Sequence, residues 1–240
     1  LTRIFVNSPL APDADVNLPD AAANHVGRVL RLRAGAVVVA FEGSGNDYRC
    51  EILSVEGDAV RVRVGPRSSG LPESPLRITL VQAVSRGERM DWTLQKATEL
   101  GVRTIVPVLS SVVRLDDNQA EKKLRHWQAI VAGACEQCGR SVVPEIRQPQ
   151  ELSRYLASST REGQRFVLSP TGPASLAGLT SVGARVELLI GPEGGLDDAE
   201  LERAAASGFA PVRLGPRVLR TETAGIVALT VLQATWGDLV

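Results

Sequence analysis

Two glycine-bearing segments near the C-terminal end of the sequence contain the residues best suited to chemistry. The first glycine loop spans Leu189 to Leu196 (LIGPEGGL), and the second glycine loop spans Leu214 to Ala224 (LGPRVLRTETA). Each follows a short apolar run that predicts a buried strand, and each leads into a helical pattern. Because ligands of α/β folds bind at the carboxyl ends of strands, the two loops predict two walls of one pocket.

Carboxylates within the loops restrict the ligand that this pocket could take. Glu193 lies in the first glycine loop and Glu222 lies in the second. A loop that cradles phosphate relies on backbone N–H groups, and a nearby carboxylate would repel the ligand. The pattern favours a cofactor without phosphates that carries positive charge, and S-adenosylmethionine fits this description. Either loop alone could equally be a tight turn between a strand and a helix, but the occurrence of both makes this reading weaker.

Composition sets broad limits on the class of protein. A length of 240 residues with 44% hydrophobic content suits one large or two small domains. The formal net charge of zero argues against bulk electrostatic binding of nucleic acid. Of the 27 basic residues, 24 are arginine, whose planar fork suits phosphates and base edges, although codon bias explains this count equally well. No apolar run reaches the length of a membrane span and no secretory pattern begins the chain, so we expect no membrane association.

The cysteines predict reduced thiols and a cytoplasmic location, because three of them form no even disulfide framework. Cys135 and Cys138 form one C-x-x-C pair. A zinc site would need a second pair or nearby histidines, and the chain has only His25 and His126. A redox pair would need a βαβ context that the helical pattern here does not give. We therefore expect two thiols on a helix and no metal.

The elements that must position these residues fall into two groups. The first ~70 residues read as all-β, with alternating runs at Ala36–Phe41, Tyr48–Val55 and Ala59–Val64 that predict a small barrel. Ser68 to Pro75 reads as a linker. After it, strands alternate with helices, which predicts a mostly parallel sheet covered on both faces. The expected strands are Leu76–Val84, Thr104–Leu109, Arg165–Leu168, Val186–Ile190 and Pro211–Leu214, and the expected helices are Gly87–Leu100, Glu121–Cys138, Asp197–Ser207 and Thr223–Leu239.

Further motifs lead to a family resemblance. They are Arg86-Gly87-Glu88-Arg89, the segment Gln95 to Gly101, the segment Cys135 to Arg140, and the segment His25 to Arg31. Read with the two glycine loops, they closely resemble the bacterial 16S ribosomal RNA (uracil-N3)-methyltransferases of the SPOUT superfamily. The resemblance covers the whole chain, with the separated motifs in the family's order.

The resemblance implies a fold and an activity. Residues 1–70 would form a PUA-like, RNA-binding β-barrel, and residues 76–240 a dimerising α/β domain with a deep trefoil knot that holds S-adenosylmethionine. The substrate would be one uridine of 16S ribosomal RNA in the small subunit, methylated at N3 by a cytoplasmic homodimer. Rival possibilities are a SPOUT 2′-O-ribose methyltransferase acting on tRNA or rRNA, and a non-catalytic RNA-binding module. A nucleotide-binding oxidoreductase is more distant, since G-x-G-x-x-G is missing.

The chemistry of this reaction assigns roles to particular residues. Uracil N3 carries a proton and is a poor nucleophile until it loses it, so a base or an anion-stabilising group is required. We expect Arg220 to orient the uracil or a phosphate and to stabilise developing negative charge. Glu222 is the candidate base or polar clamp, with a carboxylate favoured by a helix N-terminus as an equal alternative.

Two further sets of residues complete the predicted site. The expected cofactor shell is Leu168, Ile190, Gly191, Glu193, Gly194, Leu214, Gly215, Leu219 and Thr223. The expected RNA-binding residues are His25, Arg28, Arg31 and Arg33 of the barrel, with Arg86, Arg89, Lys96, Gln137 and Arg140 as a second surface. Ordinary core packing of the leucines and a solvated charged face are the alternatives.

Overall fold

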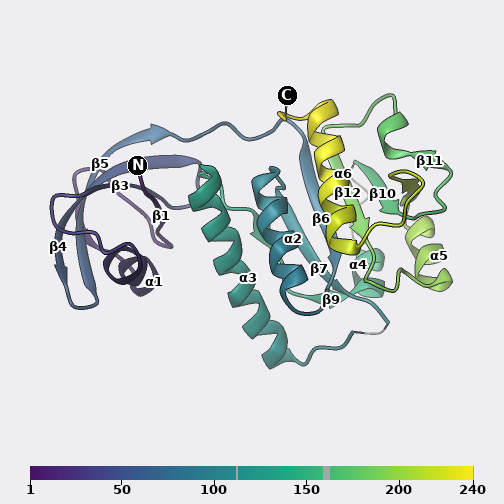
Figure 1. Cartoon of the computed structure of the whole chain (residues 1–240), viewed down its shortest axis with the longest axis horizontal. Coiled ribbons are helices and arrows are strands. Elements are labelled where there is room, and N and C mark those ends of the chain that lie inside the picture. The colour runs from purple at the N-terminus through teal and green to yellow at the C-terminus, as the bar shows by residue number, and fades with distance from the viewer. Residues whose placement is uncertain (112, 159–162, 240) are drawn as a thin grey trace. The chain divides into compact units, whose positions relative to one another are not determined.

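The computed structural model describes residues 1–111, 113–158 and 163–239, and its contacts divide the chain into two compact units (Figure 1). The N-terminal unit comprises Leu1–Glu73 and Ala132–Val143. The C-terminal unit comprises Ser74–Val131 and Pro144–Val240. Helix α3 (Asp117–Cys138) therefore contributes its first part to one unit and its last part to the other.

The N-terminal unit is built on a five-stranded sheet with the order β1-β3-β4-β5-β2. The strands are β1 (Arg3–Phe5), β2 (Asp15–Asn17), β3 (Val37–Phe41), β4 (Asn46–Glu56) and β5 (Ala59–Ser69). Along β5, Val60, Val62 and Val64 are buried while the arginines between them are exposed, so one face of the sheet makes the core. The small β domain that the sequence predicts is confirmed.

The expectation of an all-β start is wrong at one place. Asp20–Asn24 forms helix α1, which continues into a π-helical turn at His25–Val29. Ala22, Ala23 and Val26 are buried in the core of the unit, so packing stabilises a helix too short to form alone. β5 also runs on to Ser69, into the stretch that the sequence suggests is a linker.

The C-terminal unit contains an eight-stranded sheet in which every neighbouring pair is parallel. The order is β11-β13-β10-β12-β6-β7-β8, and β9 pairs with β7. The strands are β6 (Arg77–Ala83), β7 (Thr104–Leu109), β8 (Glu145–Ile146), β9 (Gln150–Glu151), β10 (Gln164–Leu168), β11 (Ala174–Ser175), β12 (Arg185–Ile190) and β13 (Ala210–Arg213).

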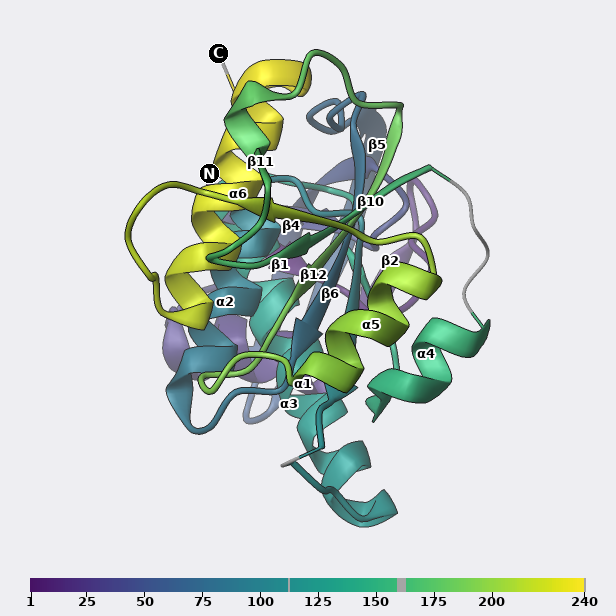
Figure 2. The same cartoon turned by 90° about the vertical axis from the view of Figure 1, so that its right-hand side faces the viewer.

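Helices cover both faces of this sheet, as a parallel sheet requires. Helices α2 (Glu88–Glu99) and α6 (Thr221–Trp236) lie side by side on one face (Figure 2). Helices α4 (Leu152–Ser158) and α5 (Asp198–Ala206) lie on the other face, where they share a buried apolar core with the strands. A short 3₁₀ turn at Leu176–Gly178 follows β11.

The helices that the sequence predicts are confirmed, with shifted ends. α3 begins at Asp117 rather than Glu121, and α6 spans Thr221–Trp236 rather than Thr223–Leu239. α5 begins with a capping box, in which Asp197 accepts from the backbone of Glu200 while Glu200 accepts from that of Asp197. Four short elements, α4, β8, β9 and β11, have no counterpart among the elements that the sequence predicts.

The chain returns across the sheet near the glycine loops. β13 follows β12 in the sequence but pairs with β10, and the chain then returns into α6. At the start of α6, the Thr221 hydroxyl donates to the Gly191 carbonyl just after β12, at 2.6 Å. The second glycine loop is therefore tied to the first, in the region where the family resemblance places the trefoil knot.

Candidate functional site

A pocket opens at the carboxyl ends of β10, β12 and β13, between the two glycine loops. Its lining includes seven of the predicted cofactor residues, namely Leu168, Ile190, Gly191, Glu193, Leu214, Gly215 and Leu219. Gly194, Thr223, Arg220 and Glu222 lie outside the lining, although each adjoins a residue that belongs to it. Strand ends of a parallel sheet thus bring together residues more than 50 positions apart, as the sequence predicts.

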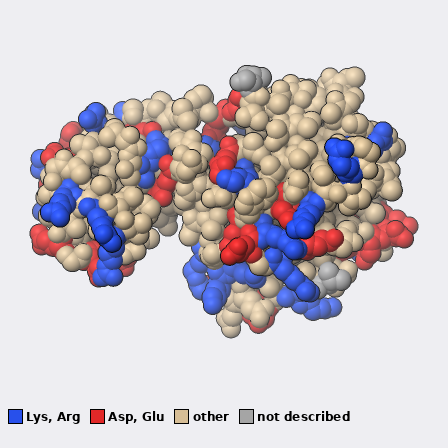
Figure 3. All heavy atoms as spheres, in the orientation of Figure 1, with Lys and Arg blue, Asp and Glu red and all other residues tan. Residues whose placement is uncertain are grey.

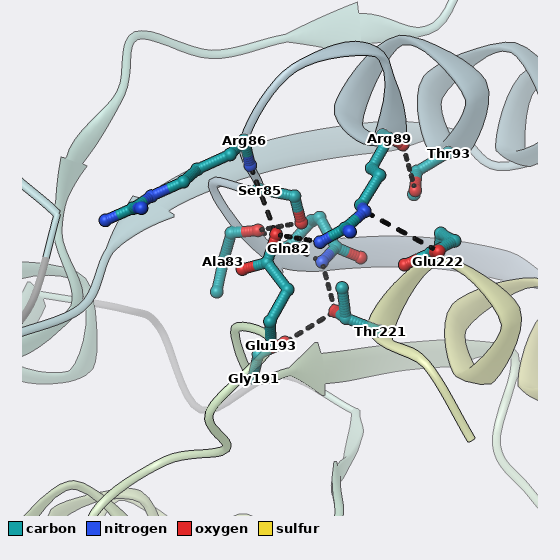
Figure 4. Close-up of polar contacts among 10 residues, drawn as sticks. All are labelled: Gln82, Ala83, Ser85, Arg86, Arg89, Thr93, Gly191, Glu193, Thr221 and Glu222. Carbon is teal, nitrogen blue, oxygen red and sulfur yellow. Dashed lines mark hydrogen bonds and ion pairs between the residues drawn. The ribbon is translucent and has the colours of Figure 1, made fainter.

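The first glycine loop is fixed by its carboxylate (Figure 4). Glu193 Oε1 accepts from the backbone N–H of Arg86 at 3.2 Å and from the guanidinium of Arg89 at 3.0 Å. Burial alone would raise the pKa of Glu193, but hydrogen bonds from backbone N–H groups and the charge of Arg89 outweigh it and lower that pKa. Glu193 is therefore an anion that anchors its loop to the start of α2.

A buried amide joins the sheet to both loops. Gln82, fully buried at the end of β6, donates from Nε2 to the Ala83 carbonyl at 3.1 Å and to Thr221 Oγ1 at 3.2 Å. Thr221 in turn donates to the Gly191 carbonyl (Figure 4). The Gly191 carbonyl oxygen can only accept, so the Thr221 hydroxyl must donate its proton to it. The same hydroxyl oxygen then accepts from the Gln82 amide. Sequence reasoning missed both residues, although a glutamine in the apolar run Leu76–Val84 was a usable signal.

The far end of the first glycine loop is fixed by a second set of bonds. Glu200 is buried, and its carboxylate accepts from the backbone N–H of Asp197 and of Ser111, each at 3.0 Å. The Ser111 hydroxyl donates to Asp197 at 3.3 Å. The capping box therefore holds the start of α5 and also the segment that follows β7.

The second glycine loop is more open. Val218 is 80% exposed, and Arg217 and Arg220 are also exposed. Arg220 is the N-cap residue of α6, and its side chain makes no capping bond among the residues that the structure describes. These side chains are free to contact molecules other than their own chain.

Glu222, on the first turn of α6, points back toward α2 (Figure 4). Its side chain is 14% exposed, and Oε1 lies 4.0 Å from Nε of Arg89. Oε2 is buried with no hydrogen-bond partner in the described part of the chain. Because a buried acceptor without a partner is costly, this oxygen is a candidate for a contact with a bound molecule.

The chemistry of the lining suits the cofactor that the sequence predicts. Leu168, Ile190 and Leu219 contribute apolar side chains to the lining, against which an adenine ring could pack. Glu193 places a carboxylate at the same wall, which suits a cationic ligand and disfavours a phosphate-bearing one. The residues present therefore fit S-adenosylmethionine.

Comparison with known proteins decides the family. The RNA methyltransferase domain family matches residues 72–233, and the RNA methyltransferase PUA domain family matches residues 18–65. A ribosomal RNA small subunit methyltransferase E of Buchnera aphidicola is 34% identical over 100% of this chain and 98% of its own length. This chain belongs to the ribosomal RNA small subunit methyltransferase E family.

Solved structures agree with this membership. A methyltransferase of Legionella pneumophila in complex with S-adenosylmethionine is 40% identical, with a TM-score of 0.95 and coverage of 99% of each chain. A ribosomal RNA small subunit methyltransferase E of Neisseria gonorrhoeae, bound to S-adenosylmethionine, is 34% identical, with a TM-score of 0.92 over the whole of both chains. The predicted fold class, a SPOUT-type parallel sheet with a small PUA-like domain, is confirmed.

The predicted RNA-binding residues of the N-terminal unit lie in and just after the π-helical turn that continues α1. Arg28, Arg31 and Arg33 are exposed and His25 is half-buried. Arg28 pairs with Asp58 at 2.5 Å on an open surface, and Arg31 has a φ of +53°. A left-handed backbone conformation at a non-glycine residue costs about 1 kcal/mol of folding free energy, so this turn forms with Arg31 in place of a glycine at that cost.

The second predicted surface is divided between the units. Arg86 and Gln137 are exposed, and Lys96 pairs with Glu99 at 2.8 Å. Arg140 is buried and bonds the Glu73 carboxylate within the N-terminal unit, which gives it a structural partner. Figure 3 shows basic and acidic side chains mixed over the surface, in keeping with a net charge of zero.

The C-x-x-C pair lies on α3, with Cys135 buried and Cys138 half-buried. Burial raises the pKa of Cys135 to about 12, which keeps it a thiol at neutral pH rather than a thiolate ligand. Within residues 1–111, 113–158 and 163–239, no cluster of three or more metal-ligating side chains is found. No helix in those ranges is long and apolar enough to cross a membrane.

Proposed function

We propose that this chain transfers a methyl group from S-adenosylmethionine to N3 of one uridine in the 16S ribosomal RNA of the small subunit. The observation that carries the proposal is the pocket between the glycine loops, beside the half-satisfied carboxylate of Glu222, in a chain of the methyltransferase E family. The two solved relatives that hold S-adenosylmethionine support the choice of cofactor.

The cofactor would lie between the two glycine loops. Leu168, Ile190 and Leu219 would flank its adenine, and backbone groups at Gly191, Gly194 and Gly215 would read polar edges of the molecule. Glu193 would face the ribose hydroxyls or the amino group, and Thr223 would close the shell. The cofactor supplies an electrophilic methyl group, and the protein's residues supply its orientation.

The residues at the start of α6 would remove the N3 proton of the uracil and stabilise the negative charge that remains. Arg220 would orient the base or a phosphate and stabilise negative charge that develops on the carbonyls beside N3. Glu222 would accept the N3 proton or a hydrogen bond through Oε2, the oxygen without a partner in the described chain. A base must leave its stack to reach such a pocket, so some unpairing of the RNA is expected.

The RNA would be positioned by both domains. Residues 1–70 would act as the RNA-binding domain and residues 76–240 as the catalytic one. His25, Arg28, Arg31 and Arg33 would contact phosphates without reading sequence. The same role is proposed for Arg86, Arg89 and Lys96 of the C-terminal unit and for Gln137 of the N-terminal unit. Arg140, buried against Glu73, would support the N-terminal unit and not contact phosphates directly.

We propose that the enzyme is a cytoplasmic homodimer that pairs through the region of α6. Half-buried apolar side chains at Ile226, Val227 and Val231 support this, because a surface of this kind is usually covered. Gly225 and Ala228 are buried within their own chain, so they bring α6 close to its own sheet. Three free cysteines support a reducing compartment.

Methyl transfer to small subunits that lack the modification tests the proposal. Labelled S-adenosylmethionine is supplied, and nucleosides are identified by mass spectrometry. Label in 3-methyluridine is the expected result. Label in a 2′-O-methylated nucleoside would overturn the proposed substrate atom, and cofactor binding without any transfer would point to another RNA.

A further inference from the structure

Gln82 places a buried amide in an apolar part of the sheet. It lies on β6, between Val81 and Ala83, which are both buried, and opposite Ile190 of β12, which lines the cofactor pocket. Among the residues that the structure describes, Oε1 of Gln82 has no hydrogen-bond partner. A buried acceptor without a partner costs folding free energy, so the benefit of an amide at this position must come from its nitrogen.

Both protons of the Gln82 amide nitrogen have an acceptor. One is donated to the Ala83 carbonyl at 3.1 Å and the other to Thr221 Oγ1 at 3.2 Å (Figure 4). Because a carbonyl oxygen can only accept, the bond to Ala83 fixes which end of the amide faces Thr221. The Thr221 hydroxyl must then accept from Gln82, and its own proton is directed to the Gly191 carbonyl at 2.6 Å.

The bond from Thr221 to Gly191 joins two segments that the protein holds unequally. On the Gly191 side, the first glycine loop is also fixed by Glu193 and, at its far end, by Glu200. On the Thr221 side, the N-cap residue Arg220 makes no side-chain capping bond in the described part of the chain. Loss of the Thr221 bond should therefore loosen the first turn of α6 more than it loosens the first glycine loop.

We propose that Gln82 is a positioning residue for methyl transfer and that it acts through the Thr221 hydroxyl. The inference rests on the proposed function, because Arg220 and Glu222 flank Thr221 in the sequence and would move with it. Those two side chains would hold the uracil in line with the methyl group, and small misplacements of reacting groups lower rates steeply. Gln82 is fully buried and is not among the residues that line the cofactor pocket, so it touches neither reactant.

Gln82→Met, Thr221→Val and the double variant test this inference. Each substitution replaces a polar side chain by an apolar one of similar size. Thr221→Val should lower kcat for 3-methyluridine formation by about 10²-fold, and Gln82→Met by about tenfold, because the hydroxyl then remains but can turn away from Gly191. The Kd for S-adenosylmethionine, measured by calorimetry, should rise by no more than about threefold in either variant. Gln128→Met, exposed on α3, is the matched control and should change neither quantity.

The double variant separates positioning from ordinary stability. In Thr221→Val, the Gln82 nitrogen is left with a buried proton that has lost its acceptor, which lowers the midpoint of urea unfolding. Replacement of both partners by apolar groups removes that cost, so the double variant should unfold at a higher urea concentration than Thr221→Val. Its kcat should stay equal to that of Thr221→Val, because the bond to Gly191 is still missing. Recovery of kcat together with stability, or a further loss of kcat, would overturn the inference.

Amide hydrogen exchange gives a readout that needs neither RNA nor cofactor. In Gln82→Met, the backbone N–H groups of the first two turns of α6 should exchange about tenfold faster than in wild type, while those of the first glycine loop should exchange at the wild-type rate. Unchanged exchange in both segments would overturn the inference. Wild type that forms no 3-methyluridine would refute the proposed function instead, and the exchange rates would still decide whether Gln82 holds the start of α6.

Discussion

The two glycine loops share a position in the fold but differ in how the protein holds them. The first is fixed at both ends, by Glu193 with Arg86 and Arg89 and by the buried carboxylate of Glu200. The second is tied through Thr221 but leaves its arginines and Val218 exposed. A loop whose polar groups are hydrogen-bonded within the protein suits a small ligand that always binds in the same way. A loop with exposed side chains suits contact with a large partner.

This difference gives the two loops separate expected phenotypes. Changes at the first loop should alter stability and cofactor affinity, because its groups are satisfied within the chain. Changes at Arg220 and Glu222 of the second loop should alter turnover and leave cofactor affinity nearly unchanged.

Arg220→Ala should have the largest effect. Loss of one cationic group that stabilises charge in the transition state lowers kcat by about 10²–10³. Affinity for S-adenosylmethionine, measured by calorimetry, should stay within twofold of wild type. Arg203→Ala, an exposed arginine of α5, is the matched control. An equal loss of cofactor affinity would place Arg220 in the cofactor site and remove the contrast between the loops.

Glu222→Gln should lower kcat by about 10², because a general base contributes on this scale. Raising the pH should restore part of the rate, since hydroxide can then remove the N3 proton. A pH–rate profile of both proteins measures this. If the variant keeps full turnover and loses only about 0.5 kcal/mol of unfolding free energy, the Glu222 carboxylate instead stabilises α6 by interacting with the positive end of the helix dipole.

Glu200→Gln should lower the free energy of unfolding by about 1–2 kcal/mol. The amide can accept only one of the two backbone bonds that the carboxylate accepts, so one N–H loses its partner. Cofactor affinity should weaken because the first glycine loop loosens, while kcat at saturating cofactor should hold. Denaturant unfolding and calorimetry measure both effects. Glu202→Gln, exposed on the same helix, should change neither.

Glu193→Gln should have the smallest effect, and one that depends on pH. The pKa of Glu193 is lowered in the folded state below its ordinary value of 4.5. The contribution of ionised Glu193 to the free energy of unfolding is therefore complete above pH 4.5. It is lost as the pH falls through the pKa of Glu193 in the folded state. The side chain is 33% exposed, so the contribution is about 0.3 kcal/mol. Unfolding curves of wild type and variant should converge as the pH falls below 4.5, and a constant gap would contradict this origin.

The sequence was most informative where a local pattern forms a local structure. The strand that ends at Ile190 and the helices expected at residues 87–100 and 197–207 could all be predicted directly, each to within a residue or two. The pocket followed from one topological rule applied to two strand ends. Seven of its lining residues were named in this way.

Long-range partners set the rest, and a single sequence does not encode them visibly. The role of Gln82 depends on Thr221, 139 residues later, which accepts from the Gln82 amide and donates to the Gly191 carbonyl. Helix α1 forms because Ala22 and Val26 meet the core of the sheet, which its local pattern did not reveal. The pairing of β6 with β12 likewise joins distant parts of the chain, with Gln82 opposite Ile190.

The order of the chain has a consequence for synthesis. Every residue that lines the cofactor pocket falls between 168 and 224, and α6 must dock before Thr221 can reach Gly191. Domains fold from the N-terminus as they leave the ribosome. If the N-terminal domain binds RNA as proposed, a nascent chain would display that domain well before it could hold a methyl donor. Each new molecule would then pass through a stage in which it could bind RNA but not modify it.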